Sequence, residues 1–461
     1  MNIKGQTDLS ATTALPTPEE NRNPELRRTR PDYITFIPSG DNPRMPDAAN
    51  EHFLVFRRAD DSLAAVWTQS GHEGQCNQHI AFAESDAHGK TWTKPRIIAG
   101  ADFCPETGKG MCSWAFPLVS KTGRIYVLFS QHAGVNDLFT HTTGWFAAIF
   151  SDDNGATWST PERVNLPRSE YDNPDETIPP SGIVWQKPLR FGGATDGAAN
   201  GTAGARGGGR YLAGLTRWVS PSRMSATSKH WFHYPSVVDF LRFENIDDNP
   251  SAGELRVTLL TAGKSLRYPP PGAPDSTVLQ EPTLNALPDG RLFTIMRTVA
   301  GHPAWSLSAD GGETWTPPEP LRYGDGLPVI AHSISPCPCY TLDAAAGEYV
   351  FLYHNHDGHF GPWIPHSNET RRPIYLSFAK YAGAAARQPL VFSSPVSWFD
   401  CDGVNLNNRC DLAMYSSFEF VDGNPVIWYP DRKHYLLGKI IAPGLRQNAV
   451  FPPPPTQQQQ G

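Results

Sequence analysis

A glutamate and an arginine stand at the two ends of one predicted hairpin. Residues 281–297 (EPTLNALPDGRLFTIMR) read as a strand, an Asp-Gly turn and a second strand. Because the turn folds the strands back on each other, Glu281 and Arg297, 16 residues apart, are predicted to lie at the same end. A carboxylate can accept a proton, and a guanidinium group can hold an anion through two parallel hydrogen bonds. The hairpin therefore predicts a site for acid–base chemistry or anion binding.

A second concentration of chemically capable residues is the histidine-rich run 353–359 (YHNHDGH), with His366 further along. His354 and His356 share one face of a predicted strand, and Asp357 offers an oxygen ligand. However, no second ligand cluster follows at a defined spacing. The run is interpreted as a solvated loop or as a binding surface for substrate hydroxyl groups, and neither a metal nor another cofactor is predicted.

Charge and hydropathy restrict the partners of the chain. The 461 residues carry a net charge of −7, whereas nucleic-acid binders usually present a basic face. A carbohydrate or small molecule is the preferred partner, and an anionic substrate would need a local arginine cluster. No apolar window of about 18 residues predicts a membrane span. The first residues lack the apolar core of a signal peptide, so the chain is intracellular or its leader has been trimmed, and the compartment stays open.

The elements that must position these residues are short strands. With 40 Gly and 44 Pro, the chain has little room for long helices. Apolar runs of strand length recur, for example at 52–58, 62–68, 124–130, 144–151 and 348–354. Residues 1–30 and 446–461 are interpreted as tails, and the Gly/Ala-rich stretch near 192–209 as a loop inside a domain.

One eight-residue pattern, S-x-D-x-G-x-T-W, repeats along the chain. It occurs at 151–158 and 308–315, and a third copy at 85–92 has Ala87 in place of the Asp. Each copy follows an apolar strand. The physical reading is a hairpin turn in which Asp accepts backbone hydrogen bonds, Gly permits a left-handed kink and Trp packs against the neighbouring sheet.

This pattern resembles the Asp-box, or BNR repeat, found on the blades of sialidase-like β-propellers. The resemblance implies an all-β chain with three Asp-box turns, folded as one six-bladed β-propeller of sialidase type over residues 31–445. It also implies that the Asp-boxes are structural and contribute no chemistry.

The resemblance further implies a set of site residues. In the sialidase superfamily three arginines hold the substrate carboxylate, a tyrosine attacks the anomeric carbon and a glutamate acts as its base. The matching positions are Arg44 (in R-M-P), Arg297, Arg371 (preferred over its neighbour Arg372), Tyr415 (in Y-S) and Glu281. A neutral tyrosine, deprotonated as it attacks, approaches a substrate that already carries a carboxylate with less repulsion than an anionic nucleophile would.

One expected part of the family's site is missing. Sialidases carry an acid/base Asp on the loop after the second strand of the first blade, and here that loop (68–79) contains none. Glu73 or His72 is predicted to donate the proton instead, with Asp47 as another possibility. The missing Asp weakens the prediction that the sugar is sialic acid.

The sequence is therefore interpreted as an exo-glycosidase of the sialidase superfamily that removes a terminal acidic sugar. One alternative is a propeller hydrolase or lyase on another acidic polysaccharide, with His72 or His79 as base. Another is a carbohydrate-binding propeller without catalysis. In the structural alternative, the arginines form rim salt bridges and Tyr415 is a wedge between blades. The segment 229–234 is either a sugar-stacking rim or blade core.

The seven cysteines leave the redox state open. Cys401 and Cys410 could close a loop, and Cys337 and Cys339 could form a tight pair, but buried free thiols fit the sequence as well.

Overall fold

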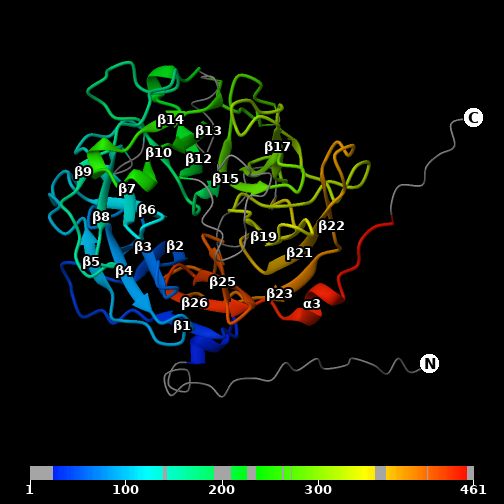
Figure 1. Cartoon of the computed structure of the whole chain (residues 1–461), viewed down its shortest axis with the longest axis horizontal. Helices are drawn as coiled ribbons and strands as arrows, with labels where there is room; N and C mark the ends of the chain where they lie inside the picture. The colour runs from blue at the N-terminus through cyan, green and yellow to red at the C-terminus, as the bar shows by residue number, and fades with distance from the viewer. Residues whose placement is uncertain are drawn as a thin grey trace, which may run out of the picture.

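Six antiparallel sheets are arranged as a ring around a central axis (Figure 1). The computed structural model describes residues 24–138, 143–191, 209–225, 235–261, 264–270, 272–358, 370–412 and 414–453, and the six sheets are counted within these ranges. Each sheet is one blade. The predicted all-β, six-bladed propeller is therefore confirmed.

The blades follow one another along the chain. Blade 1 contains β2 (Ala49–Arg57), β3 (Leu63–Ser70), β4 (His79–Ser85) and β5 (Arg96–Ala99). Blade 2 contains β6 (Cys112–Val119), β7 (Ile125–His132), β8 (Gly144–Ser151) and β9 (Glu162–Arg163). Blade 3 contains β10 (Gly182–Ile183), β11 (Leu189–Phe191), β12 (Arg210–Trp218), β13 (Ser236–Phe243) and β14 (Val257–Leu259).

The second half of the ring continues this order. Blade 4 contains β15 (Leu279–Ala286), β16 (Leu292–Thr298), β17 (Ala304–Ser308) and β18 (Glu319–Pro320). Blade 5 contains β19 (Cys339–Asp343), β20 (Glu348–Tyr353), β21 (Ile374–Tyr381), β22 (Leu390–Phe392) and β23 (Val396–Phe399). Blade 6 contains β24 (Ser417–Val421), β25 (Asn424–Asp431), β26 (Tyr435–Ile440) and, from the start of the chain, β1 (Tyr33–Phe36).

The two ends of the chain close the ring together. Strand β1 pairs antiparallel with β26, with Tyr33 opposite Gly438, so blade 6 is built from both ends (Figure 1). The helical turn η1 (Pro24–Arg27) precedes it, and the Leu26 side chain is fully buried in the core of blades 5 and 6. Residues 24–30, within the predicted N-terminal tail, therefore pack on the propeller. The Gly-rich stretch 192–208 and the segment 229–234 lie outside the described residues.

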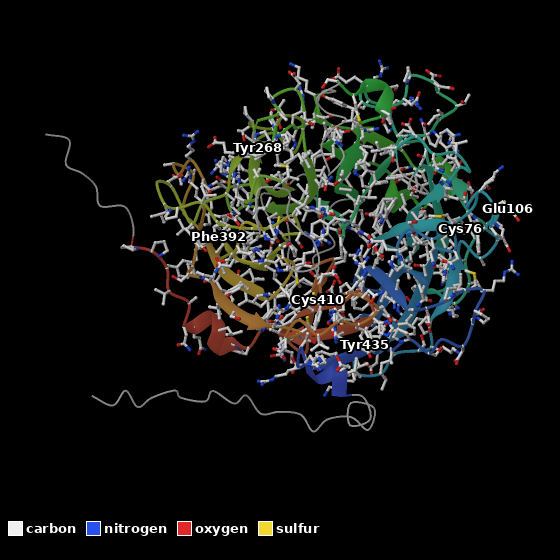
Figure 2. All side chains as sticks on the ribbon, turned by 180° about the vertical axis from the view of Figure 1, so that it is seen from behind. Cys76, Glu106, Tyr268, Phe392, Cys410 and Tyr435 are labelled. Carbon is white, nitrogen blue, oxygen red and sulfur yellow. The ribbon has the colours of Figure 1, made fainter. Side chains whose placement is uncertain are left out.

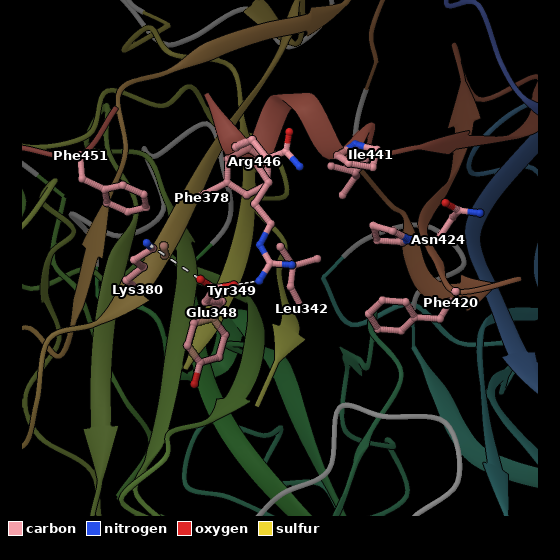
Figure 3. A pocket seen from close by; sticks show the side chains of 15 residues that line it. Leu342, Glu348, Tyr349, Phe378, Lys380, Phe420, Asn424, Ile441, Arg446 and Phe451 are labelled. Carbon is pink, nitrogen blue, oxygen red and sulfur yellow. Dashed lines mark ion pairs between the residues drawn. The ribbon is translucent and has the colours of Figure 1, made fainter. Parts of the chain in front are cut away.

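Helix α3 (Pro443–Gln447) lies against blades 5 and 6 at the end of the propeller. It borders a cavity of about 500 Å³ that is lined from β20, β21 and the start of β25. Arg446 of α3 and Lys380 of β21 converge there on Glu348 (Figure 3). These contacts attach the C-terminal segment to the ring.

The pattern of each Asp-box produces a closed turn at the outer edge of its blade. The Asp153 carboxylate accepts from the Ser151 hydroxyl (2.8 Å), the Thr157 N–H (2.8 Å) and the Thr157 hydroxyl (2.6 Å). The Gly155 N–H donates to the Ser151 hydroxyl at 2.8 Å, and Gly155 has a φ of +97° that suits glycine. The hydrogen bonds from Thr157 and Ser151 lower the pKa of Asp153 to about 2.

The other two turns show how much the pattern can vary. In 308–315, Asp310 accepts the same set of hydrogen bonds from Ser308 and Thr314. In 85–92, which lacks the pattern's Asp, Asp86 takes over from the previous position, and its contacts to the Ser85 and Thr91 hydroxyls lengthen to 3.4 Å.

The tryptophan of each turn packs on the preceding blade, as predicted. Trp158 meets Phe82 edge to face with ring centres 5.2 Å apart, and Trp315 stacks on Phe240 at 4.1 Å. Trp92 packs against Trp428 of blade 6 at 5.6 Å. The Asp-box turns therefore join neighbouring blades as well as ending strands.

Among the described residues, no disulfide joins any of the seven cysteines, including the two pairs considered from the sequence. The Cys401 thiol donates to the Cys410 carbonyl at 3.0 Å. Cys76 and Cys410 are labelled in Figure 2, where they lie well apart. Within the described part of the chain, no helix is long and apolar enough to span a membrane.

Candidate active site

Three inner strands carry the same irregularity, a bulge with a non-glycine residue at positive φ. The residues are His52 in β2 (φ 53°), Trp114 in β6 (φ 57°) and Glu281 in β15 (φ 51°). The strand register shifts at each of these positions. Left-handed backbone costs an ordinary residue about 1–2 kcal/mol, so three such bulges indicate a shared purpose. Each re-aims a side chain that would otherwise follow the regular alternation of its strand.

Neighbouring blades support two of these bulges with the same device. The Thr68 hydroxyl of β3 accepts the Trp114 N–H at 2.7 Å, and the Thr216 hydroxyl of β12 accepts the Glu281 N–H at 2.6 Å. Both threonines are buried. A threonine on the second strand of one blade thus holds the bulge on the first strand of the next. These hydrogen bonds satisfy N–H groups that the disrupted ladder leaves free.

Tyr415 lies where the bulged residues meet. Its hydroxyl donates to Glu281 Oε1 at 3.0 Å, and Arg297 Nη1 donates to the same oxygen at 2.7 Å and reaches the Tyr415 hydroxyl at 3.4 Å. Residual exposure is 6% for Tyr415 and 3% for Glu281. Burial, followed by the Glu281 charge, raises the pKa of Tyr415 to about 12. The tyrosine is therefore a neutral phenol in contact with a proton-accepting carboxylate.

The Tyr415 ring is enclosed by aromatic and cationic groups. The His52 ring centre lies 4.5 Å away and that of Trp185 6.3 Å away, the latter edge to face. Lys433 Nζ stands 5.1 Å from the centre of the ring, within range of a cation–π contact. Trp114 packs in turn against His52 and Trp218.

A charge network extends from the buried Lys433 to Glu73, whose side chain is 41% exposed. The Lys433 ammonium group contacts Glu73 at 2.6 Å and Glu51 at 3.3 Å. Arg409 also pairs with Glu73, and it contacts Asp411 at 3.5 Å. Three carboxylates thus face two cations in this part of the network.

Arg371 completes the balance of charge. Its Nη1 lies 3.9 Å from Asp411, while its Nε donates to the Ile334 carbonyl at 3.1 Å. With Arg371 added, and with Arg297 paired to Glu281, every cation of the site has a carboxylate partner. A ligand carboxylate would therefore have to compete with groups that are already present.

Lys433 lies in an unusual hairpin turn between β25 and β26. Three residues, 432–434, connect the two strands. Arg432 and Lys433 are the central residues of the turn, with φ values of 51° and 50°, and the His434 N–H donates to the Asp431 carbonyl at 2.9 Å. Such turns favour Asn and Gly because both central residues are left-handed. Here two basic residues take the strain, and both are buried in ion pairs: Arg432 with Asp431, and Lys433 with its glutamates.

The network separates the pKa values of its acids. Burial and then the charge of Glu73 raise the pKa of Glu51 to about 7. The pKa of Glu73 is held well below its usual range by Lys433 and Arg409, against the effect of burial. Burial, with Lys433 nearby, lowers the pKa of His52 to about 3, so its imidazole is neutral.

Several buried polar atoms around Tyr415 have no hydrogen-bond partner. Across the described residues they include both ring nitrogens of His52, Oε2 of Glu281, Nε of Arg297 and both carboxylate oxygens of Asp411. Folded proteins rarely leave buried polar groups unsatisfied. Their concentration at one place is typical of a site completed by a polar ligand such as a sugar.

The structure brings three of the predicted residues together and distributes the others. Tyr415, Glu281 and Arg297 are in mutual contact, as described above. Arg371 lies in the adjoining network, whereas its neighbour Arg372 pairs with Asp400 at 2.6 Å. Arg371 and Arg372 therefore face different partners.

Arg44 does not join this group. It lies exposed on the loop before β2, and no described residue forms a hydrogen bond or ion pair with its guanidinium group. Asp47, from the same loop, accepts the backbone N–H groups of Ser39 and Gly40 at 2.7 and 3.0 Å. The loop is thus organised around its own turn.

The proposed proton donors on the loop 68–79 also have partners. Glu73 is bound to Lys433 and Arg409, while His72 is exposed and contacts the Glu73 carbonyl through Nδ1 at 2.9 Å. His79 is buried, with Nε2 3.2 Å from the Gln69 side-chain oxygen.

The histidine-rich run forms no metal site in the described part of the chain. His354 is fully buried, with Nδ1 3.1 Å from the Pro373 carbonyl and Nε2 3.0 Å from the Ser335 hydroxyl. No group of three His, Cys, Asp or Glu residues there could hold a metal ion. His359 and His366 lie outside the described residues.

Five members of the site and its charge network were not singled out from the sequence: His52, Glu51, Lys433, Arg409 and Asp411. His52 and Glu51 lie inside an apolar strand pattern, which gives no sign of a bulge. Lys433 had a local signal, since 431–434 (DRKH) joins two alternating strands without Gly or Asn.

Comparisons with known proteins agree with this architecture. Residues 61–239 match the BNR repeat-like domain. No curated protein matches the sequence. A solved protein of unknown function from Dyadobacter fermentans is 13% identical with a TM-score of 0.56, covering 89% of this chain and 97% of its own.

Two further solved structures carry names. The intramolecular trans-sialidase from Ruminococcus gnavus, solved with oseltamivir carboxylate, is 16% identical with a TM-score of 0.53, covering 86% of this chain and 95% of its own. The α-L-arabinanase from Penicillium chrysogenum, solved with arabinobiose, is 12% identical with a TM-score of 0.50, covering 89% and 97%. At these identities the likeness is one of fold. The predicted resemblance to BNR-repeat propellers of sialidase type is confirmed.

Proposed function

We propose that this propeller is a glycoside hydrolase in which Tyr415 is the nucleophile and Glu281 its base. The observation that carries the proposal is the buried contact of 3.0 Å between the Tyr415 hydroxyl and Glu281 Oε1. A structural tyrosine wedge would need only a backbone partner. Here the buried hydroxyl instead meets a carboxylate and the Arg297 guanidinium, beside polar atoms that have no hydrogen-bond partner among the described residues.

In this mechanism the tyrosine passes its proton to Glu281 while its oxygen attacks the anomeric carbon. Because the pKa of Tyr415 is raised to about 12, the phenolate is not formed in advance, and deprotonation accompanies attack. Arg297 bridges both oxygens, so it stabilises the negative charge wherever it resides during the transfer. Two successive displacements at the anomeric carbon would give retention of configuration.

For the substrate, we propose a terminal acidic sugar whose carboxylate is held by Arg297 and Arg371. Arg297 is bound to Glu281 beside the Tyr415 hydroxyl, and Arg371 lies in the adjoining charge network. Arg44 is left out because its loop is exposed. The sialidase named above has the same fold and supports this substrate class by analogy.

The charge balance favours a second candidate, a neutral glycoside. Every cation near Tyr415 already faces a carboxylate, and the unsatisfied atoms include acceptors on Glu281 and Asp411. Such a site suits hydroxyl donors, and an α-L-arabinanase has the same fold.

The test is turnover of a matched panel of fluorogenic glycosides: a sialoside, a uronic-acid glycoside and an arabinofuranoside. Wild type is expected to cleave one class, and Tyr415→Phe to lose turnover by on the order of 10³-fold or more with ligand affinity nearly unchanged. Tyr435→Phe, which alters a tyrosine of β26 away from the Tyr415–Glu281 contact, is the matched control. Binding without turnover would identify a carbohydrate-binding propeller. Unchanged turnover in Tyr415→Phe would contradict the mechanism.

A further inference from the structure

We infer that Glu51 is the proton donor of this site, positioned by Lys433 and kept distinct from Glu73 by their unequal ion pairing. The inference rests on the proposed glycosidase function and supplies the group that the loop 68–79 was expected to provide. It concerns a residue of β2, one position before the His52 bulge.

The position of Glu51 meets the geometric requirement. Its Oε2 lies 3.3 Å from Lys433 Nζ, and that ammonium lies 5.1 Å from the centre of the Tyr415 ring. The adjacent residue, His52, packs directly on the same ring at 4.5 Å. Lys433 thus contacts both the Glu51 carboxyl group and the ring of the nucleophile, while Glu281 contacts the Tyr415 hydroxyl directly.

Glu51 is as deeply buried as Glu281, the proposed base, but the two carboxyl groups have different partners. The side chains of Glu51 and Glu281 are both 4% exposed. A proton donor must remain protonated until the leaving group departs, and burial in a site of low polarity achieves this for a carboxylic acid. Glu281, by contrast, accepts a hydrogen bond from Arg297 at 2.7 Å and another from the Tyr415 hydroxyl at 3.0 Å. The two carboxyl groups of the site therefore have the environments of an acid and of a base.

Glu73 is the less suitable donor. It lies closer to Lys433 (2.6 Å) than Glu51 does, and it has a second cation, Arg409. When two carboxylates share cations unequally, the proton resides on the one with the weaker pairing. That residue is Glu51, in agreement with its pKa of about 7 and with the low pKa of Glu73. His52 is neutral and His72 is exposed, so neither competes.

Each of the two displacement steps transfers two protons. As Tyr415 attacks, the bond between the anomeric carbon and the leaving-group oxygen breaks, and its electron pair stays with that oxygen. Glu51 gives its proton to this oxygen, while Glu281 receives the proton of Tyr415. In the second step water adds to the anomeric carbon and gives a proton to Glu51, and Tyr415 leaves and regains its proton from Glu281. Both carboxyl groups end in their starting states.

The decisive experiment compares Glu51→Gln with wild type on two glycosides of the preferred sugar, one with a good aryl leaving group and one with an alkyl leaving group. An acid matters most for the poor leaving group. We expect a loss of about 10²–10⁴-fold on the alkyl glycoside and a loss at least tenfold smaller on the aryl glycoside. Added azide or formate should restore turnover of the aryl glycoside by Glu51→Ala.

Glu73→Gln is the matched control and has its own signature. Removing the Glu73 charge leaves Lys433 wholly to Glu51 and lowers the pKa of Glu51. The alkaline limb of the kcat/KM profile, set by loss of the Glu51 proton, should therefore move to lower pH in Glu73→Gln and vanish in Glu51→Gln. Circular dichroism confirms that both variants fold.

The outcomes separate the two proposals. If Tyr415→Phe abolishes turnover but Glu51→Gln loses the same factor on both glycosides, or keeps the alkaline limb, the inference is wrong and the proposed function stands. If Tyr415→Phe retains turnover, or wild type cleaves no glycoside, the proposed function fails and the proton donor with it.

Discussion

The outer Asp-box turns and the inner-strand bulges each occur three times, but the hydrogen bonding of their functional side chains differs. In the turn 151–158 the oxygens of Ser151 and Asp153 all have hydrogen-bond partners within the same eight residues. At the bulges, His52 leaves both ring nitrogens unsatisfied and Glu281 leaves one carboxylate oxygen unsatisfied, among the residues described. The Asp153 carboxylate is thus satisfied within its own turn, although Asn154 Oδ1 and Trp158 Nε1 of the same turn have no partner within the ranges described, whereas the Glu281 carboxylate keeps one oxygen without a partner.

The difference indicates where stability and function reside in this fold. The Asp-boxes place glycine at left-handed positions such as Gly155 and Gly312, although Asn154 is left-handed as well, and their tryptophans join two blades. Each bulge places a non-glycine residue in the same backbone region, and a threonine of the neighbouring blade supports two of the three bulges. At the bulges, the backbone strain lies beside buried polar atoms that a polar ligand could satisfy.

The largest effect should come from breaking the inner network at its centre. Lys433→Met removes the cation that pairs with Glu51 and Glu73 and should lower the free energy of unfolding by about 1–3 kcal/mol, because the buried Glu51 carboxyl group loses its hydrogen-bond partner. Denaturant unfolding measures this. Lys90→Met, at an exposed position of an outer turn, is the control and should change little. A loss no larger than that of the control would show that the network does not stabilise the fold.

The next effect depends on pH and isolates Glu51. Its pKa is raised from 4.5 to about 7, so the folded state binds the proton more tightly than the unfolded state does. The stability that Glu51 contributes is therefore fully present below pH about 4.5 and is lost as pH rises through about 7, with a slope of at most about 1.4 kcal/mol per pH unit. Wild type should lose stability relative to Glu51→Gln across this window. A difference independent of pH would contradict the assignment.

The smallest effect is expected at the outer turns. Asp310→Ala removes the hydrogen bonds to Ser308 and Thr314 and should lower stability by about 0.5–2 kcal/mol, toward the lower end because the turn is largely exposed. Asp153→Ala should act in the same direction. Turnover by the folded fraction should be unchanged, since neither residue contacts the site. Thermal unfolding and kcat measured side by side test this, with the exposed Glu170→Ala as control. A large fall in kcat at unchanged melting temperature would disprove it.

The sequence predicted those features that are encoded locally. Three copies of an eight-residue turn predicted the propeller through their resemblance to the Asp-box repeat. The turn itself was predictable because each copy carries its own hydrogen-bond donors, acceptors and glycine. Glu281 and Arg297 were also predictable together, since a single Asp-Gly hairpin brings them to one end. Their contact at 2.7 Å depends on little beyond that hairpin.

The features that the sequence did not predict depend on contacts between blades. Lys433 of blade 6 meets Glu51 and Glu73 of blade 1 only because the ring closes, at a sequence separation of more than 350 residues. The bulge at His52 is likewise invisible in an apolar strand pattern. For the same reason Arg44, placed by a short motif alone, lies on an exposed loop, while His52 lies beside Tyr415.

The central claim, that Tyr415 becomes covalently bonded to the sugar, can be tested by trapping the intermediate. A glycosyl fluoride of the preferred sugar, with a second fluorine beside the anomeric carbon, slows the second step, and mass spectrometry of a tryptic digest locates the label. If Tyr415 is the nucleophile, the modified peptide is 410–432, and its fragmentation places the sugar on Tyr415 rather than Tyr429. A sugar on Glu281 or Glu51, or turnover of the reagent by Tyr415→Phe at the wild-type rate, would contradict it.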